Sequence, residues 1–379
     1  MKRLLCIVGG MNAGGAETFL MKIYRQIDRN LFQMDFAVGI KDEGDYDKEI
    51  YELGGKIFHI TPKSKGFLKN FICIKNLVER EQYKYVLRTS QHSLSALELF
   101  AARLGGAKVL AFRSSNTNTT TAGGKDLLLH KLCSFMPNLF SNVRIAPSTE
   151  AAEYMFGKKC VEKGKAHILH NGVDLSQFCY SKTRREKIRS ELGIEKRYVV
   201  GHVGRFTAQK NHKFLIDIFS QIVSERKDAV LVLVGEGELE IEIRKQINEL
   251  HLNDKVLFTG VRKDVSALLS AFDIMIFPSY YEGMPNVIIE AQASGLPCII
   301  SNRITYEADI TGLVEYVSLD DSAKKWMNIV LQKNTSRIDT KLDFIKKRYD
   351  IVSVANEFLI LLKMKDGINK VYSVRRKNK

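Results

Sequence analysis

The chain has 379 residues, of which 45% are hydrophobic and 27% are charged, with six cysteines and six prolines. This length suggests two domains of ordinary size, and the composition argues against a disordered chain, a collagen-like repeat or a disulfide-dense scaffold. The formal net charge of +15 favours an anionic partner. No nucleic-acid-binding motif accompanies this charge, so we expect no nucleic-acid partner.

The cysteines lie far apart and form no C-x-x-C pair, which argues against a zinc site or a disulfide framework. A reducing, cytoplasmic compartment fits this pattern. The basic start and the apolar residues 4–8 look like a signal peptide, but Gly9 and Gly10 interrupt the run, so we predict a buried strand instead. No other apolar run reaches the roughly 18 residues of a membrane span.

Short apolar runs alternate with longer segments of helical period, which is typical of parallel sheets covered by helices on both faces. In the first half we predict strands at residues 4–8, 34–39, 56–60, 85–87, 108–112, 144–147 and 167–169, and helices at 17–27, 69–81 and 93–104. In the second half we predict strands at residues 199–203, 230–234, 256–259, 274–277, 298–301 and 312–317, and helices at 212–224, 239–250, 265–270 and 286–293. The sequence therefore predicts an α/β fold of two doubly wound, Rossmann-like domains, with ligands expected in a cleft beyond the carboxyl ends of the strands.

The polar, charge-rich residues 174–197 are a plausible linker between these domains. We predict a first domain at residues 1–177 and a second at 178–352. Residues 353–379 are expected to form a helix that returns to the first domain, followed by a basic tail. That tail either touches anionic lipid or is an ordinary frayed terminus.

A glycine-rich loop at residues 9–17 joins the first strand to the first helix. It does not fit G-x-G-x-x-G and lacks an acidic ribose contact, so we expect no nicotinamide or flavin cofactor. Gly14 and Gly15 either leave room for a sugar or phosphate at the start of the helix or make an ordinary tight turn. After the second strand, Asp45 and Asp47 spell D-x-D, which we interpret as a solvated loop, away from the loops expected to bind a ligand, rather than a metal site.

Basic and apolar residues mix at residues 63–69, where Lys63, Lys65 and Lys69 flank Phe67 and Leu68. This mixture predicts either peripheral contact with an anionic membrane or simply the start of an amphipathic helix.

Two loops of the second half carry charges suited to a diphosphate. After the strand at 199–203, Gly204 lets the backbone turn close to a ligand, and Arg205 and Lys210 either hold phosphate oxygens or are two surface cations. After the strand at 274–277, Pro285 is acceptable at the first helical position, and the N–H groups of that helix end favour an anion. Glu282 precedes this helix and Glu290 lies more than a turn into it; a bare pair of glutamates at this spacing is usually two solvated side chains.

The whole set of segments resembles glycosyltransferase family 4, retaining enzymes of the GT-B fold that include bacterial capsule and exopolysaccharide glycosyltransferases. The resemblance covers about residues 4 to 360, and it implies that the domain at 1–177 binds the acceptor and the domain at 178–352 binds the donor. The matching segments are residues 14–17, 170–174, 204–206, 210–212, 235–237, 258–260 and 278–297.

The resemblance implies roles for individual residues. Glu282 corresponds to the glutamate that contacts the transferred sugar, Glu290 to the one that binds ribose hydroxyls, and Arg205 and Lys210 to the pair that neutralises the leaving diphosphate. The implied donor-binding set also includes Gly14, Gly15, Gly235, Gly237, Gly260, Arg262, Gly283, Met284, Pro285 and Asn286.

His92, after the strand at 85–87, is the candidate for the family's catalytic cleft histidine, although a helix-capping role is an equal alternative. Many relatives carry further histidines after the next strand, where this chain has residues 113–116, Arg-Ser-Ser-Asn. This departure leaves the role of His92 open.

The resemblance thus predicts a retaining glycosyltransferase that uses a nucleotide-diphosphate sugar, with uridine favoured over guanosine, and a glycan or lipid-linked saccharide acceptor. It also predicts no metal or other cofactor, with helix N-termini and basic side chains in the metal's place. We expect a cytoplasmic protein, peripheral at the inner face of the cell membrane. The alternatives are a non-catalytic GT-B subunit that binds nucleotide or a partner enzyme, and a sugar-nucleotide epimerase.

Overall fold

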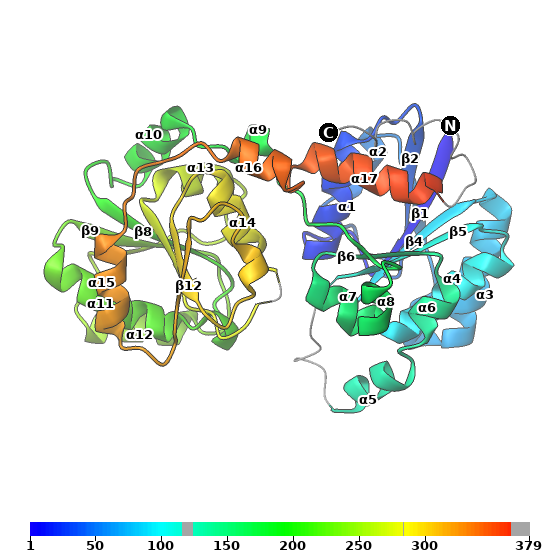
Figure 1. The fold of residues 1–379 in the computed structure, drawn as a ribbon, viewed down its shortest axis with the longest axis horizontal. Coiled ribbons are helices and arrows are strands. Elements are labelled where there is room, and N and C mark those ends of the chain that lie inside the picture. The colour runs from blue at the N-terminus through cyan, green and yellow to red at the C-terminus, as the bar shows by residue number, and fades with distance from the viewer. Residues whose placement is uncertain (116–123, 283, 365–379) are drawn as a thin grey trace. The chain divides into compact units, whose positions relative to one another are not determined.

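The computed structural model describes residues 1–115, 124–282 and 284–364, and the chain forms two compact units (Figure 1). The first unit contains Met1–Gly172 together with the chain from Ile351 onward, and the second contains Val173–Asp350. The structure therefore divides the chain at 172/173 and 350/351, where the sequence suggests 177/178 and 352/353.

The first unit is built on a parallel sheet with the strand order β3-β2-β1-β4-β5-β6-β7. Its strands are β1 Lys2–Val8, β2 Phe32–Val38, β3 Ile57–His59, β4 Tyr85–Ser90, β5 Val109–Ser114, β6 Val143–Ala146 and β7 His167–Ile168. Its helices are α1 Gly15–Gln26, α2 Asp47–Glu52, η1 Lys63–Lys65, α3 Phe67–Glu81, η2 Ser93–Ala96, α4 Leu97–Leu104, α5 Gly124–Leu132, α6 Met136–Phe140, α7 Thr149–Phe156, α8 Lys158–Glu162 and α17 Ile351–Met364.

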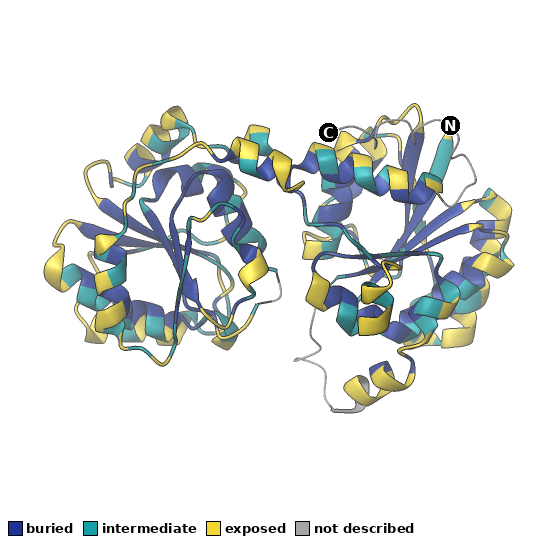
Figure 2. Cartoon of the chain, in the orientation of Figure 1, coloured by how far each residue is buried: buried dark blue, intermediate teal, exposed yellow. Residues whose placement is uncertain are grey.

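Side chains alternate between the two faces of this sheet, so each strand feeds two cores. In β1, Leu4 and Cys6 belong to the core beneath α1 and α17, whereas Leu5 and Ile7 belong to the core on the opposite face. Because both faces are covered, the strands are continuous apolar runs, which explains why the sequence pattern reveals them. Figure 2 shows the buried strands between helices whose outer faces are exposed.

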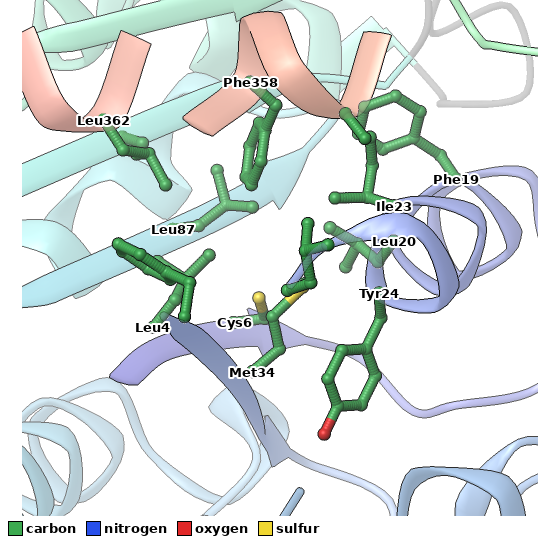
Figure 3. Packing of buried hydrophobic residues seen from close by; sticks show 14 of the residues in the cluster. Leu4, Cys6, Phe19, Leu20, Ile23, Tyr24, Met34, Leu87, Phe358 and Leu362 are labelled. Atoms are coloured by element: carbon green, nitrogen blue, oxygen red, sulfur yellow. The ribbon is translucent and has the colours of Figure 1, made fainter. Parts of the chain in front are cut away.

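The last described helix, α17, completes the first core. Phe358 and Leu362 point from α17 towards Leu4 and Leu87 of the sheet, and Phe19 of α1 lies beside them (Figure 3). The predicted basic tail, from residue 365 onward, lies outside the residues that the structure describes.

The second unit repeats the architecture with the parallel strand order β10-β9-β8-β11-β12-β13. Its strands are β8 Tyr198–Val203, β9 Ala229–Val234, β10 Val256–Phe258, β11 Ile274–Phe277, β12 Cys298–Ser301 and β13 Val314–Val317. Its helices are α9 Leu175–Phe178, α10 Lys182–Glu191, η3 Ala208–Lys210, α11 His212–Glu225, α12 Glu240–Glu249, α13 Val265–Ala271, α14 Asn286–Ala293, η4 Tyr306–Ala308, α15 Ala323–Gln332 and α16 Lys341–Lys346.

The order of each sheet reverses once. In the first unit the chain builds outward from β1 to β3 and then returns to place β4 beside β1; in the second it returns to place β11 beside β8. Ligands of open α/β sheets bind at such switch points, beyond the carboxyl ends of the two neighbouring strands. The predicted α/β fold of two Rossmann-like units is therefore confirmed, and it directs attention to the loops after β1, β4, β8 and β11.

None of the helices in the part of the chain that the structure describes is both long and apolar enough to cross a bilayer.

Candidate functional site

The loops after β8 and β11 meet at the switch point of the second sheet. The amide of Tyr280 donates to the carbonyl of Gln209 (2.9 Å), and the Gln209 side chain donates to the carbonyl of Tyr281 (2.9 Å). The Asn211 side chain donates to the carbonyl of Pro278 (3.2 Å). These bonds hold two segments about 70 residues apart in the sequence in one fixed arrangement.

Lys210 and Glu282, both singled out in the sequence, form an ion pair in this arrangement. Lys210 Nζ lies 2.6 Å from Glu282 Oε1, and the side chains are only 18% and 12% exposed. The ammonium also lies 4.6 Å from the centre of the Phe277 ring, a cation–π contact. The sequence predicts both residues in the site but does not predict that they bond to each other.

Helix α14 begins beside this pair. Pro285 is the residue before the helix and its carbonyl accepts from the amides of Ile288 (3.0 Å) and Ile289 (3.3 Å), so its predicted place at the first helical position is wrong by one residue. The reason is its extended backbone, with ψ at 96°. The first N–H groups of an α-helix find no partner inside the helix, so this end suits an anion.

The remaining predicted residues of this segment take different positions. Asn286 is the first residue of α14, half-buried, and Glu290 is a half-buried residue of the second turn. Met284 packs against the core of the unit. Gly283 lies outside the described residues.

Two predicted donor glycines are required by the packing of neighbouring loops. A Cβ on Gly235 would lie 2.2 Å from the carbonyl oxygen of Gly204, and one on Gly237 would lie 2.5 Å from that of Phe206. Gly235 also has a φ of 130°, which strongly favours glycine. The structure thus supplies a local reason for both glycines, whether or not a ligand approaches them.

The two arginines near these loops differ in whether their side chains are already paired with carboxylates or are exposed. Arg205 is exposed, at the start of the turn that leads to Lys210. The guanidinium of Arg262 instead lies 2.8 Å from Glu191 and 2.7 Å from Asp264. Gly260, beside Arg262, has a φ of 66° and open space where a Cβ would point. Arg262 would have to exchange these carboxylates for a ligand.

Two neighbouring histidines next to Lys210 were not predicted as site residues, although His212 belongs to the matching segment 210–212. The rings of His202 and His212 are 4.7 Å apart and buried, and His202 Nδ1 lies 2.9 Å from the carbonyl of Ile276. Burial lowers the pKa of His212 to about 4, with a further contribution from Lys210. Burial also lowers the pKa of His202, so both rings are neutral near pH 7, and His202 stacks on Phe277, whose ring Lys210 contacts.

In the first unit, the glycine-rich loop after β1 leads directly into α1. Gly14 precedes the helix and Gly15 is its first residue. A Cβ on Gly14 would lie 2.5 Å from a carboxylate oxygen of Glu17, whereas the position beside Gly15 is open. The space expected at Gly14 is thus occupied by this chain's own carboxylate.

The D-x-D segment is partly solvated, as predicted, since Asp45 is exposed, but it does not lie away from the candidate donor loops. Asp45 Oδ2 accepts from the amide of Ala13 in the glycine-rich loop (2.9 Å), and the buried Asp47 carboxylate accepts from the amide of Gly44 (3.0 Å). These carboxylates satisfy backbone donors and brace the loop. Within the described ranges, no group of three His, Cys, Asp or Glu side chains is placed to hold a metal ion.

His92 lies in the turn after β4 and precedes η2. Its amide donates to Ser90 Oγ (3.1 Å), and Ser90 Oγ donates to Ser95 Oγ (2.9 Å). The neighbouring Ser93 bonds to the buried ring of His130 (2.9 Å), which stacks on Tyr154. Burial lowers the pKa of His130. His130 escaped the sequence analysis because nothing marks a lone histidine in a leucine-rich helix.

Arg113 is the first residue of the segment 113–116, where this chain departs from the expected family pattern. It is buried at the end of β5, its guanidinium lies 3.7 Å from the centre of the Phe19 ring, and it donates to Asn171 Oδ1 at 2.6 Å. Burial lowers the pKa of Arg113 to about 9, and the charge of Glu17 opposes that shift. The residue connects α1 to the segment that leaves the first unit.

Lys63 does not face the surface freely, contrary to the expected basic–apolar membrane patch. Its Nζ lies 3.1 Å from the carboxylate of Glu98 and 2.9 Å from Ser95 Oγ. Lys65, Phe67, Leu68 and Lys69 are exposed. The basic and apolar patch expected at residues 63–69 is therefore reduced to these four residues.

Comparisons with known proteins agree with this architecture. A family model described as glycosyl transferases group 1 matches residues 184–328. A putative glycosyltransferase, EpsF, of Bacillus subtilis is 34% identical over 355 residues, which cover 91% of this chain and 91% of that protein. A UDP-Gal:alpha-D-GlcNAc-diphosphoundecaprenol alpha-1,3-galactosyltransferase of Escherichia coli is 29% identical over 62% of each chain. The crystal structure of Anabaena Alr3699/HepE in complex with UDP, at 21% identity, superposes with a TM-score of 0.75 and covers 96% of this chain and 100% of that one.

Proposed function

We propose that the donor of this chain is a uridine-diphosphate sugar bound in the second unit. The premise is that the chain belongs to the group 1 family of glycosyl transferases and is a glycosyltransferase of polysaccharide or lipid-linked saccharide synthesis. The observation that carries the proposal is the Lys210–Glu282 ion pair at the switch point, beside the start of α14. A diphosphate at this point would meet Lys210, Arg205 and the N–H groups of the helix. These groups hold negative charge without a metal.

The proposed reaction moves the sugar with retention of its anomeric configuration. The bond between the anomeric carbon and the donor phosphate oxygen breaks, and a bond to the acceptor oxygen forms on the same face of the sugar. The leaving phosphate takes the acceptor proton. Lys210 and Arg205 would stabilise the charge that develops on that phosphate, while Glu282 contacts the sugar and Glu290 the ribose.

The choice of uridine and of a lipid-linked acceptor rests on the relatives. The Escherichia coli relative is named for UDP-Gal and a diphosphoundecaprenol acceptor, and a Campylobacter jejuni relative is named for a diphospho-undecaprenol acceptor. We infer that the acceptor of this chain belongs to the same chemical class and meets the first unit near the turn that carries His92.

Peripheral membrane contact is part of this proposal. Residues 61–76 contain no acidic residue, and within them Lys65, Phe67, Leu68 and Lys69 are exposed. Further exposed apolar side chains are Leu128 and Leu132 of α5, Phe135 of the turn that follows and Leu139 of α6. Apolar side chains that enter the headgroup region beside basic ones favour an anionic bilayer.

The first experiment tests donor binding and chemistry together. The melting temperature is measured with nucleoside diphosphates and their sugars, and slow hydrolysis of the best donor is followed without acceptor. We expect UDP to raise the melting temperature and Glu282→Ala to abolish turnover with the fold intact. Glu315→Ala, which removes another paired carboxylate of the same unit, is the control and should retain turnover.

Other results identify the alternatives. Conversion of the donor sugar to its epimer without acceptor identifies an epimerase. Nucleotide binding without hydrolysis or transfer identifies a non-catalytic subunit. The anomeric configuration of the product, read by NMR, tests retention, and an inverted product contradicts it.

Membrane contact is tested by sedimentation with vesicles of anionic and of zwitterionic lipid. We expect binding to the anionic vesicles alone, and less of it in the Leu128→Glu/Leu132→Glu variant. If the protein fails to sediment with anionic vesicles, that result contradicts membrane docking.

A further inference from the structure

An apolar pocket of about 350 Å³ lies in the first unit, between the start of α3 and the η2–α4 segment. Its apolar walls are formed by Phe67, Leu68, Phe71, Leu94 and Leu97. This volume falls in the range of small-ligand pockets. The mechanism described above does not use this pocket.

The charged groups at one side of the pocket carry more positive than negative charge. Lys63, Asn70 and Glu98 are the polar lining residues, and Arg88 of β4, which lies outside the lining, forms an ion pair with the same Glu98 carboxylate. The three charged side chains are largely buried, with exposed fractions of 27%, 5% and 12% for Lys63, Glu98 and Arg88. Two cations therefore share one carboxylate, so the cluster can accept one more anionic group.

The titration of Lys63 agrees with this charge balance. Burial and the nearby Arg88 lower the pKa of Lys63 to about 8, although Glu98 opposes the shift. A further anion beside Lys63 would favour its charged form.

The same cluster bonds to the turn that carries His92, the candidate catalytic histidine. Lys63 Nζ donates to Ser95 Oγ (2.9 Å), Ser90 Oγ donates to Ser95 Oγ (2.9 Å), and the amide of His92 donates to Ser90 Oγ (3.1 Å). A ligand whose charged group rests at Lys63 therefore lies next to the turn on which we place the acceptor.

These features favour an amphiphilic ligand that has an apolar chain and one anionic group. A sugar needs partners for its hydroxyl groups, and the walls offer almost none. A bilayer surface meets exposed side chains, whereas a pocket with one charged end takes a single chain that carries an anionic group.

We propose that this pocket binds the lipid end of the acceptor, with an isoprenoid chain against Phe67, Leu94 and Leu97 and the attached phosphate beside Lys63. The inference rests on the proposed transfer to a lipid-linked saccharide and adds where its lipid is recognised.

The experiment measures binding of geranyl diphosphate, a short water-soluble probe, by calorimetry in the presence of saturating UDP and without any bilayer. Inorganic diphosphate and geraniol are the two reference ligands. We expect geranyl diphosphate to bind at least about tenfold more tightly than either, since the pocket pairs an apolar wall with a cationic end.

Variants locate the site. Phe67→Glu and Lys63→Met should each weaken geranyl diphosphate at least about tenfold. Leu68→Glu, at a more exposed wall residue, serves if Phe67→Glu does not fold. Ile72→Glu is the matched control, because Ile72 lies on the same helix with similar exposure but outside the pocket lining.

Equal binding of inorganic and geranyl diphosphate, or equal loss in Ile72→Glu, would overturn the proposal. So would unchanged binding in both the Phe67 and Lys63 variants. UDP binding in the same samples separates this outcome from failure of the proposed function: if UDP binds and geranyl diphosphate does not, only the lipid pocket is wrong.

Discussion

Replacing Lys210 with methionine tests whether the ion pair at the switch point is a prepared site. The change removes the ammonium 2.6 Å from Glu282 and leaves a carboxylate that is only 12% exposed without its partner. Breaking a fully buried pair costs about 3–5 kcal/mol, and hydrogen bonds to charged groups contribute about 1.5–3 kcal/mol. Because both side chains keep some contact with solvent, we expect Lys210→Met to lower the free energy of unfolding of the second unit by about 2 kcal/mol.

Calorimetry and urea unfolding measure this loss. For a unit of this size, 2 kcal/mol corresponds to a fall of about 4–8 °C in the melting temperature. The double variant Lys210→Met/Glu282→Gln removes the unpaired charge, so it should regain at least half of the lost stability. Activity should nevertheless be abolished in both, since the proposed diphosphate contact is gone in each.

The pair Lys333–Glu315 provides the control. It lies in the same unit at 2.8 Å, but its side chains are 25% and 41% exposed. Lys333→Met should cost no more than about 1 kcal/mol and leave transfer intact. If Lys210→Met costs no more than this control and retains full turnover, the pair at the switch point is an ordinary surface ion pair and the reasoning fails.

Three further predictions concern packing, pH and metals. Gly201→Ala should lower the free energy of unfolding by about 1–3 kcal/mol in urea titrations, because its Cβ would lie 2.0 Å from the Phe272 ring; an unchanged midpoint would show that the ring moves freely. The lowered pKa of His212, about 4 against 6.5 when unfolded, makes the unfolded chain bind more protons between these values. The contribution of His212 to the free energy of unfolding should therefore be fully present above about pH 6.5 and be lost towards pH 4. His212→Phe should flatten this pH dependence, and an unaltered pH profile would contradict the reasoning. Transfer should persist in excess EDTA, and a loss that Mg²⁺ or Mn²⁺ reverses would disprove metal independence.

Local patterns in the sequence were enough to predict most strands. The runs at 274–277 and 298–301 coincide with β11 and β12, and the helix at 286–293 coincides with α14. Strands covered on both faces are continuously apolar, and helix starts carry their own local signals, so both can be recognised from neighbouring residues.

Long-range relations could not be predicted in the same way. The sequence marks Lys210 and Glu282 separately, but their bond depends on β11 lying beside β8, which no local pattern specifies. It presents Lys63 as one lysine of a surface patch, whereas Glu98, 35 residues later, draws it into a buried cluster.

The sequence by itself thus determined the alternation of strands and helices and the residue types available at the end of each strand, because these depend on neighbours along the chain. The tertiary structure alone decided which charges pair, why Gly235 must be glycine, and that a pocket adjoins the His92 turn. The physical reason is that strand order and side-chain packing join residues distant in the sequence, and burial then sets the strength and partners of their charges.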